Sequence, residues 1–370
     1  MLTVGKEGSP LIKINGGSDI RAVAFAVNGE YLSTCDREKV RVWRVEDGKQ
    51  MATVEADFVQ CLAVSKDGRW ITAGTAWGEA FVLNANTYEK VFSHREDHNY
   101  IFGVDFSPDS SRLVSASDQC TASIWDIPTR QRVQSLRHED WVIAAKYSPQ
   151  GDRIATATRH SDVRVWDSND GRLLVDIKVT VTPLCNTGLL WCNNHLFVVS
   201  DNKIKQIEAS TGSTFSEWPV PDTNLSSCIA LPKHGKFIAY STWRTVTFWD
   251  TATHTQLGLI QHSSEIHSIA VSPDDLFLAI GGWEGRITIN SLPRITVSIL
   301  SLDYGAYEQL SCSDHFSVRL NPLVSSYTSH IPGRVGRSSI GVWQVEGCLG
   351  CHCQREYLIC SLVPLVGLTL

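Results

Sequence analysis

The chain has 370 residues, more than one hydrophobic core usually serves, so it forms either two domains or one architecture built from repeated units. With 43% hydrophobic and 19% charged residues it can bury a large interior, which excludes a disordered chain or a coiled-coil rod. A formal net charge of −6 without clustered Lys and Arg argues against nucleic acid as the main partner.

The lack of a visible secretory signal and the pattern of cysteines favour an intracellular protein, cytoplasmic or nuclear. The opening residues MLTVGKEGSPLIKING lack the basic and then apolar pattern of a secretory signal. The longest apolar run, residues 357–370, contains Pro364 and Gly367 and is shorter than the roughly 20 residues of a membrane helix. The eleven Cys are an odd and scattered set, typical of reduced thiols rather than a disulfide framework. We therefore expect no membrane partner.

The predicted elements start with a short apolar segment, residues 11–14, and continue as a repeated pattern to about residue 291. When the repeats are aligned, two positions recur about every 40 residues, the period typical of a propeller or solenoid. We call the seven residues at each of these positions a column. The first contains large apolar residues: Trp43, Leu83, Trp125, Trp166, Ile207, Trp249 and Ile289. The second contains turn formers suited to a tight or positive-φ backbone: Gly29, Gly68, Ser110, Gly151, Asn193, Gly235 and Asp275.

Between the columns, β-branched and aromatic residues alternate with period two, as in RIATAT and FIAY. Each unit therefore predicts four short antiparallel strands, and seven such units bury their faces by stacking around an axis. Leu11 lies nine residues before Ile20, as Val133 does before Val142. We expect residues 11–14 to supply the outer strand of the last blade, with ITVSIL (295–300) as the competing segment.

Several segments resemble the WD-repeat family of β-propellers. Trp125-Asp126, Trp166-Asp167 and Trp249-Asp250 match its dipeptide, and residues 138–167 match nearly a full repeat. The resemblance implies a buried network in which His138 and Thr158 join Trp166, although His160 stands where the family has Asp. It also implies binding of other proteins through one rim of the ring.

The turn between the second and third strand of each unit is the most informative position for function. Six residues before the first column stand Arg37, Trp77, Gln119, His160, Asp201, Trp243 and Trp283. Because strands alternate in direction, these turns share a rim with the loops between units. Polar, Gly-containing contexts indicate that the three Trp project from this rim. We expect Trp77, Trp243, Trp283, Arg37, His160 and Gln119 to bind a partner; alternatively, the rings fold onto the neighbouring blade.

Two other sets of residues have simpler interpretations. The column residues Trp43, Trp125, Trp166 and Trp249 are expected to be core anchors between blades. The tail motif CLGCHC with Cys360 contains soft ligands for zinc at Cys348, Cys351, Cys353 and Cys360 and formally matches haem attachment. Free thiols are favoured, so no metal and no cofactor are expected.

The sequence thus predicts an all-β, seven-bladed propeller of four-stranded antiparallel blades over residues 1–302, followed by an irregular tail, 303–370. An eighth blade at SSIGVWQVEG (338–347) is the alternative for the tail. No phosphate-loop, HExxH or GxSxG motif is present, so we expect no enzyme, although one using the central channel stays an option. The predicted function is a protein-interaction scaffold within a larger complex. The alternative is a reader of glycans or methylated cations through aromatic pockets.

Overall fold

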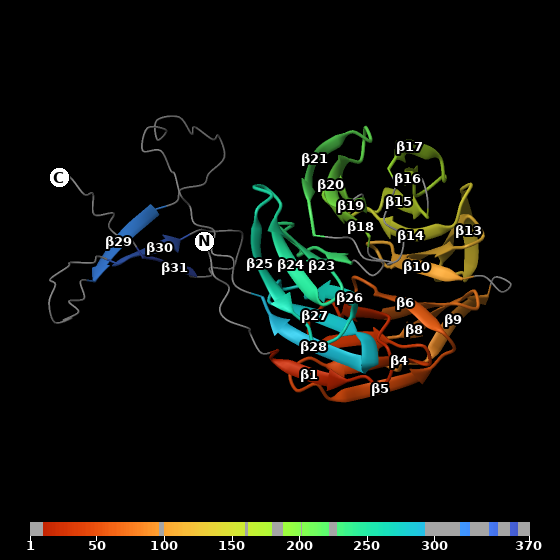
Figure 1. The fold of residues 1–370 in the computed structure, drawn as a ribbon, viewed down its shortest axis with the longest axis horizontal. Helices are drawn as coiled ribbons and strands as arrows, with labels where there is room; N and C mark the ends of the chain where they lie inside the picture. Colours follow the sequence, from red (N-terminus) through yellow and green to blue (C-terminus); the bar gives the residue numbers. More distant parts are fainter. Residues whose placement is uncertain are drawn as a thin grey trace. The chain divides into compact units, whose positions relative to one another are not determined.

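The computed structural model describes residues 10–95, 100–159, 162–179, 188–200, 202–221 and 228–292, together with the backbone of three later strands. The chain divides into two compact units, residues 1–295 and 296–370. In the described ranges the first unit forms seven four-stranded antiparallel sheets around an axis, and the prediction of a seven-bladed β-propeller is confirmed (Figure 1).

The blades follow one another along the chain, each starting with its innermost strand. Blade 1 contains β2 (Ala22–Phe25), β3 (Tyr31–Cys35), β4 (Lys39–Arg44) and β5 (Gln50–Glu55), and blade 2 contains β6 (Val59–Val64), β7 (Trp70–Thr75), β8 (Glu79–Asn84) and β9 (Lys90–Arg95). Blade 3 contains β10 (Ile101–Phe106), β11 (Arg112–Ser117), β12 (Thr121–Asp126) and β13 (Gln131–Arg137), and blade 4 contains β14 (Val142–Tyr147), β15 (Arg153–Thr158), β16 (Asp162–Asp167) and β17 (Leu173–Lys178).

The remaining blades keep this order until the ring closes. Blade 5 contains β18 (Leu189–Cys192), β19 (His195–Ser200), β20 (Lys203–Glu208) and β21 (Thr214–Pro219), and blade 6 contains β22 (Ile229–Ala230), β23 (Phe237–Ser241), β24 (Thr245–Asp250) and β25 (Gln256–Gln261). Blade 7 contains β26 (Ile266–Val271), β27 (Phe277–Gly282) and β28 (Arg286–Ser291), with β1 (Ile12–Asn15) as its outer strand. The short 3₁₀ turn η1 (Trp283–Gly285) is the single helical element of the described ranges, and no helix there is long and apolar enough to cross a membrane.

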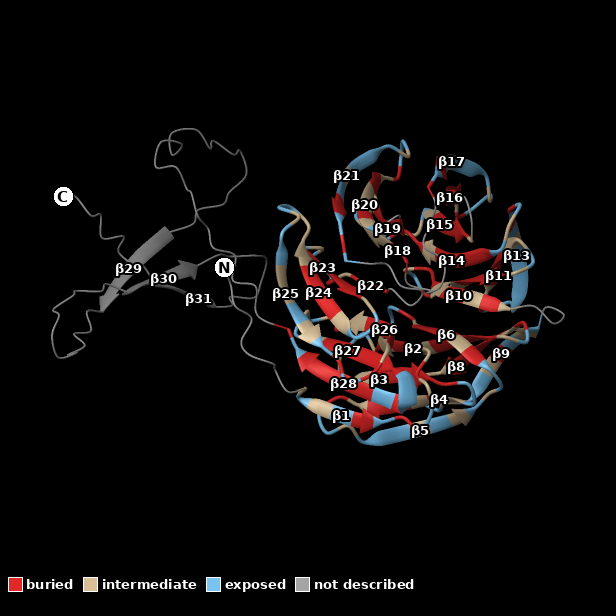
Figure 2. Cartoon of the chain, viewed as in Figure 1, coloured by how far each residue is buried: buried red, intermediate tan, exposed pale blue. Residues whose placement is uncertain are grey.

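The core lies between neighbouring blades. Figure 2 shows the inner strands buried or half-buried and outer strands such as β5 and β17 largely exposed. One apolar cluster joins Cys61 and Val82 of blade 2 to Val104 and Trp125 of blade 3. Since each buried aliphatic side chain contributes about 1.5–3 kcal/mol, these inter-blade clusters stabilise the ring as a whole.

The two ends of the repeat region meet in blade 7. Strand β1 pairs with β28 in antiparallel register, with Ile12 opposite Ile289 and Ile14 opposite Ile287. Ile14 is 7% exposed and packs in the cluster that joins blades 7 and 1. This pairing covers the edge of β28, which would otherwise offer unpaired backbone groups. The competing segment, 295–300, lies outside the described residues.

The second sequence column occupies the turns between the first two strands of each blade. All seven of its residues have positive φ angles, from 52° at Asn193 to 82° at Gly151. The expectation of a positive-φ backbone at this column is therefore confirmed, and Gly is the residue that adopts it with least strain.

The tail contains three strands, and the second lies within SSIGVWQVEG (338–347), the segment considered for an eighth blade. β29 (Arg319–Ser325), β30 (Ile340–Glu346) and β31 (Glu356–Ser361) form a three-stranded antiparallel sheet. The remaining residues of the tail lie outside the described ranges. The proposed boundary at residue 302 stays a prediction.

Candidate interaction surface

One rim of the propeller gathers two kinds of loop. The turns between the second and third strands of the blades bind, through backbone hydrogen bonds, the residue that precedes the inner strand. These bonds run from Ala76 N–H to Phe58 O (2.8 Å), Asp118 N–H to Tyr100 O (3.1 Å), Arg159 N–H to Trp141 O (3.0 Å) and Trp283 N–H to Glu265 O (2.8 Å). We call this edge the turn rim; the positive-φ turns lie at the opposite ends of the same strands.

The three Trp of these turns are exposed. Trp77, Trp243 and Trp283 have 45%, 52% and 46% of their surface accessible. An indole that buries about 150–250 Å² against a partner is typical of the residues that dominate binding energy. The structure therefore leaves three such rings available on the turn rim.

The three rings form two groups rather than one cluster. Trp243 O accepts a hydrogen bond from Ile266 N–H (2.7 Å), and Trp283 N–H donates to Glu265 O. The turns of blades 6 and 7 are therefore both hydrogen-bonded to the start of the inner strand of blade 7. Trp77 belongs to blade 2, where its ring meets Phe58 edge-on at 5.3 Å between centroids. Blade 1 separates the two groups.

The polar residues predicted for this rim are only partly described. Arg37 and Gln119 are exposed in the turns of blades 1 and 3. His160 lies outside the described residues, and its predicted role stays a prediction. Arg37 O accepts a hydrogen bond from Phe58 N–H, which ties the turn of blade 1 to the loop before blade 2.

The structure adds aromatic residues that the sequence analysis missed. Phe58 (43% exposed) and Trp141 (39% exposed) each immediately precede an inner strand, as does Tyr100. Phe102 lies 4.7 Å from the ring of Tyr100 and 5.9 Å from that of Trp141, measured between centroids. The signal was an aromatic residue recurring one repeat apart, just before the first apolar residue of the inner strand.

Arg side chains accompany the exposed indoles. The Arg159 guanidinium lies 4.6 Å from the Trp141 ring centroid, and that of Arg244 lies 5.3 Å from the Trp243 centroid. Trp and Arg side by side on an exposed surface match the composition of binding hot spots.

The column Trp have a different environment. Trp43, Trp125 and Trp166 are 5%, 3% and 7% exposed, whereas Trp249 is partly buried against the apolar cluster that joins blades 5 and 6. Each indole N–H donates to a hydroxyl of its own blade: Trp43 to Thr34 (2.8 Å), Trp125 to Ser115 (3.1 Å), Trp166 to Thr156 (2.8 Å) and Trp249 to Thr247 (3.0 Å). Such fully satisfied rings hold strands in register and leave no free polar group for a partner.

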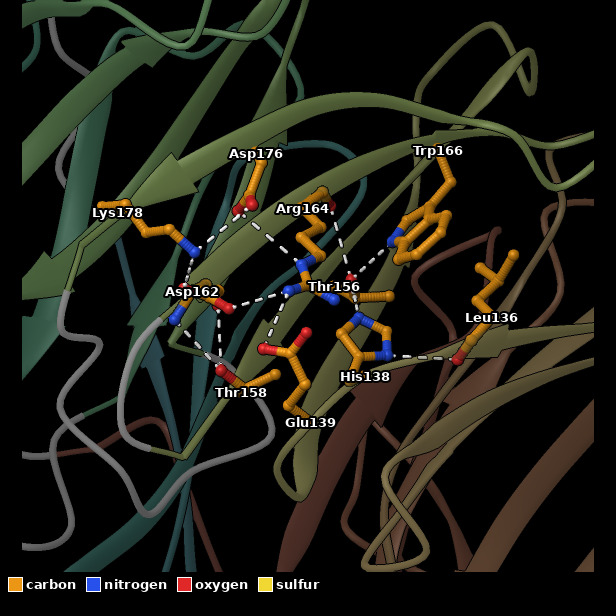
Figure 3. Close-up of polar contacts among 10 residues, drawn as sticks. All are labelled: Leu136, His138, Glu139, Thr156, Thr158, Asp162, Arg164, Trp166, Asp176 and Lys178. Atoms are coloured by element: carbon orange, nitrogen blue, oxygen red, sulfur yellow. Dashed lines mark hydrogen bonds and ion pairs between the residues drawn. The ribbon is translucent and has the colours of Figure 1, made fainter.

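The blade 4 network differs from the predicted one in its central residue (Figure 3). Thr156, and not Thr158, joins Trp166 to His138: the Thr156 Oγ1 lies 2.8 Å from both Trp166 Nε1 and His138 Nε2. His138 Nδ1–H donates to Leu136 O at 3.1 Å, so Nε2 accepts from the threonine hydroxyl. Burial lowers the pKa of His138 to about 4, helped by the nearby Arg164 charge.

Thr158 belongs to a neighbouring charge cluster. Its hydroxyl accepts from Asp162 N–H (3.0 Å), and the Asp162 carboxylate contacts Arg164 at 3.2 Å and Lys178 at 2.8 Å (Figure 3). Asp176 lies 3.6 Å from Arg164 and 3.2 Å from Lys178. Asp162 and Arg164 are almost fully buried, so their charges balance one another in the interior.

Metal and thiol chemistry find little support in the described residues. No group of three or more His, Cys, Asp and Glu residues there could hold a metal ion. Burial raises the pKa of Cys61 to about 12 and raises that of Cys35, so both thiols stay protonated and pack as core residues. Cys348, Cys351 and Cys353 lie outside the described residues, and only the backbone of Cys360 is described, in β31.

The repeats match a known family. The model of the WD domain, G-beta repeat, matches residues 8–44, 88–126, 130–167 and 254–289. Each matched segment begins at the outer strand of one blade and continues through the three inner strands of the next, as β1 to β4 do. This chain is a WD-repeat β-propeller. The offset between repeat and blade explains why β1 is needed to complete blade 7.

This WD-repeat propeller is similar to several curated proteins. It is 26% identical over 308 residues to WD repeat-containing protein 18 of Danio rerio, covering 74% of this chain and 70% of that protein. It is 23% identical to the pre-rRNA-processing protein crb3/ipi3 of Schizosaccharomyces pombe, over 69% of this chain and 60% of that protein. It is also 23% identical to the U3 small nucleolar RNA-associated protein 15 homolog of Xenopus laevis, over 63% and 46%.

Proposed function

We propose that this WD-repeat propeller is a non-enzymatic scaffold that presents its turn rim to partner proteins within a larger intracellular complex. The observation that carries the proposal is the exposure of Trp77, Trp243 and Trp283 on one rim, while the column Trp are buried or partly buried. Large apolar rings exposed on a rigid sheet scaffold are costly in water unless a partner covers them.

The relatives support the setting. Two of them are named for pre-rRNA processing and for association with a small nucleolar RNA. Those names are consistent with work inside a multi-protein assembly, in the cytoplasm or the nucleus. Proteins are favoured here over nucleic acid as the direct partner because the chain carries net negative charge and no long basic run.

The alternative reader of glycans or methylated cations is less well supported. An aromatic cage needs free ring faces for stacking or cation–π contact. Arg159 and Arg244 already lie over the rings of Trp141 and Trp243. These contacts favour a surface that packs against a protein.

The test is affinity capture with identification of the bound proteins by mass spectrometry. Replacing Trp77, Trp243 and Trp283 together with Ala is expected to abolish capture and to leave the circular dichroism spectrum and cooperative melting unchanged. The matched control replaces Met51, Leu173 and Phe215 with Ala, since these exposed apolar residues lie on the outer strands β5, β17 and β21. Unaltered capture by the Trp variant, or equal loss in the control, would overturn the proposal.

A further inference from the structure

A β-bulge opens the inner strand of at least five blades and redirects one residue in each. In blades 2, 3, 4 and 7 the pairing register shifts around Gln60, Phe102, Ile143 and His267. In blade 1, Ala22 pairs with Cys35, and Arg21 N–H also donates to Cys35 O (2.8 Å). Arg21 and Ala22 therefore both face one residue of β3, and Arg21 is the bulged residue of this blade. Bulges often re-aim side chains beside functional sites.

These bulged residues lie together at the turn-rim end of the inner strands. Phe102 contacts Tyr100 and Trp141, and His267 meets Trp283 at 5.7 Å between ring centroids. Strand β2 packs between β26 and β6, which places Arg21 between His267 and Gln60. The five positions therefore form an arc that runs from Trp283 in blade 7 to Trp141 in blade 4.

Arg21 is the unusual member of this arc. Its side chain is half-buried, and its Nε atom is buried with no hydrogen-bond partner among the described residues. A buried donor of a charged group that lacks a partner costs free energy, and a carboxylate is the group that best satisfies a guanidinium.

Other positive and polar groups surround Arg21. The guanidiniums of Arg21 and Arg37 both lie close enough to Tyr100 to lower its pKa, against the larger effect of burial, which raises it. Both also act on His267, whose pKa is lowered mainly by burial. Acidic groups lie on the His267 side: Glu265 lies 3.9 Å from His267, and Asp19 accepts from Glu284 N–H at 3.2 Å.

We propose that Arg21, with Arg37 and the Tyr100 hydroxyl, binds the carboxylate of an Asp or Glu side chain in a peptide segment docked on the turn rim. Phe102 and Trp141 on one side then pack against apolar side chains that flank this acidic residue. The inference rests on the proposed function and adds the chemistry of the partner. We call Arg21, Arg37 and Tyr100 together the Arg21 site.

The test uses synthetic peptides and the full chain. The probes are fluorescently labelled heptapeptides, blocked at both ends, with a central Glu and neighbours varied among Phe, Tyr, Leu and Pro; matched pools carry Gln, Lys or phosphoserine at the centre. Fluorescence polarisation measures the affinity of each pool. The Glu pool is expected to bind roughly ten- to a hundredfold more tightly than the Gln pool, as for a charged hydrogen bond.

Variants then locate the effect. Arg21→Gln is expected to reduce Glu-pool binding to the level of the Gln pool and to leave Gln-pool binding unchanged, whereas Arg21→Lys keeps part of the preference. Arg172→Gln, on the exposed turn between β16 and β17, is the matched control and is expected to change nothing. The Glu–Gln comparison on the unaltered chain remains decisive if Arg21→Gln fails to fold.

Several results would overturn the Arg21 site. These are equal affinity for the Glu and Gln pools, binding only of the phosphoserine pool, no binding of the Glu pool at millimolar concentration, or an unchanged preference in a folded Arg21→Gln variant. Failure of the proposed function gives a different pattern, in which alanine at Trp77, Trp243 and Trp283 leaves protein capture intact.

Discussion

At the scale of single residues, His138 shows how a blade depends on one protonation state. Its Nδ1–H donates to Leu136 O, and its Nε2 accepts from Thr156, whose hydroxyl also accepts from Trp166 (Figure 3). A proton on Nε2 would remove the acceptor of the Thr156 hydroxyl and would add a positive charge beside Arg164 in the interior. Burial and the Arg164 charge accordingly hold the His138 pKa at about 4, below the ordinary 6.5.

We predict that this residue makes the protein sensitive to acid. Because the pKa of His138 is lower in the folded than in the unfolded chain, its stabilising contribution is complete above pH 6.5 and is lost as the pH falls towards 4. The shift corresponds to about 3 kcal/mol. Urea unfolding at pH 7, 5.5 and 4.5 should show a smaller loss of stability for His138→Gln than for the unaltered chain. Identical losses would contradict the account.

The positive-φ turns offer a second prediction at this scale. Gly68 has φ +72° and open space around the position of a Cβ atom, whereas a Cβ at Gly151 (φ +82°) would lie 3.1 Å from Pro108 Cδ. Gly68→Ala should therefore cost only backbone strain, about 1 kcal/mol. Gly151→Ala should cost clearly more, as measured by denaturant unfolding. Equal costs at the two positions would show that the contact with Pro108 is unimportant.

At the scale of elements, the strand that closes the ring is the most vulnerable. β1 is four residues long, and its Ile14 is buried between blades 7 and 1, whereas Lys13 is exposed on the other face. We predict that Ile14→Ala lowers the free energy of unfolding by about 2–4 kcal/mol, as for other buried aliphatic truncations. Lys13→Ala, in the same strand, serves as the control and should change it little. Similar effects of both would mean that β1 does not hold the ring closed.

Strand positions were predictable because their signals are local. Alternating β-branched residues and the column from Gly29 to Asp275 set the strands and turns without any knowledge of contacts. The choice between Thr156 and Thr158 was not local, since both lie on the same face of β15. Only the register with β16, which places Ile154 opposite Trp166, decides which hydroxyl reaches the indole.

Cross-strand charge pairs were missed for the same reason. Asp162 stands opposite Lys178 and Arg164 opposite Asp176 in the pairing of β16 with β17. Opposite charges at facing positions stabilise a sheet, but their sequence separation depends on turn length and on the bulge near Trp166. In the tail the repeat period is lost, so β29 and β31 carried no signal of the kind that revealed the blades, and only β30 lies in a repeat-like segment, 338–347.

At the scale of the whole molecule, the propeller holds its indoles in two environments. The Trp of the first column pack between blades. Trp77, Trp243 and Trp283 are exposed in the turns between the second and third strands of their blades. The sequence indicates these two environments because strand residues flank the first column, whereas Gly and polar residues flank the Trp of the turns. It could not reveal the bulges that bring Arg21, Phe102 and His267 to the same rim.

Oxidative footprinting of tryptophan, read by mass spectrometry with and without the captured partner, tests the account most directly. In the free chain, Trp77, Trp243 and Trp283 should oxidise rapidly, whereas the buried Trp43, Trp125 and Trp166 should react slowly. Addition of the partner should protect the first set and leave the second unchanged. Slow oxidation of the first set in the free chain, or rapid oxidation that the partner does not reduce, would contradict the assignment of the turn rim as the docking surface.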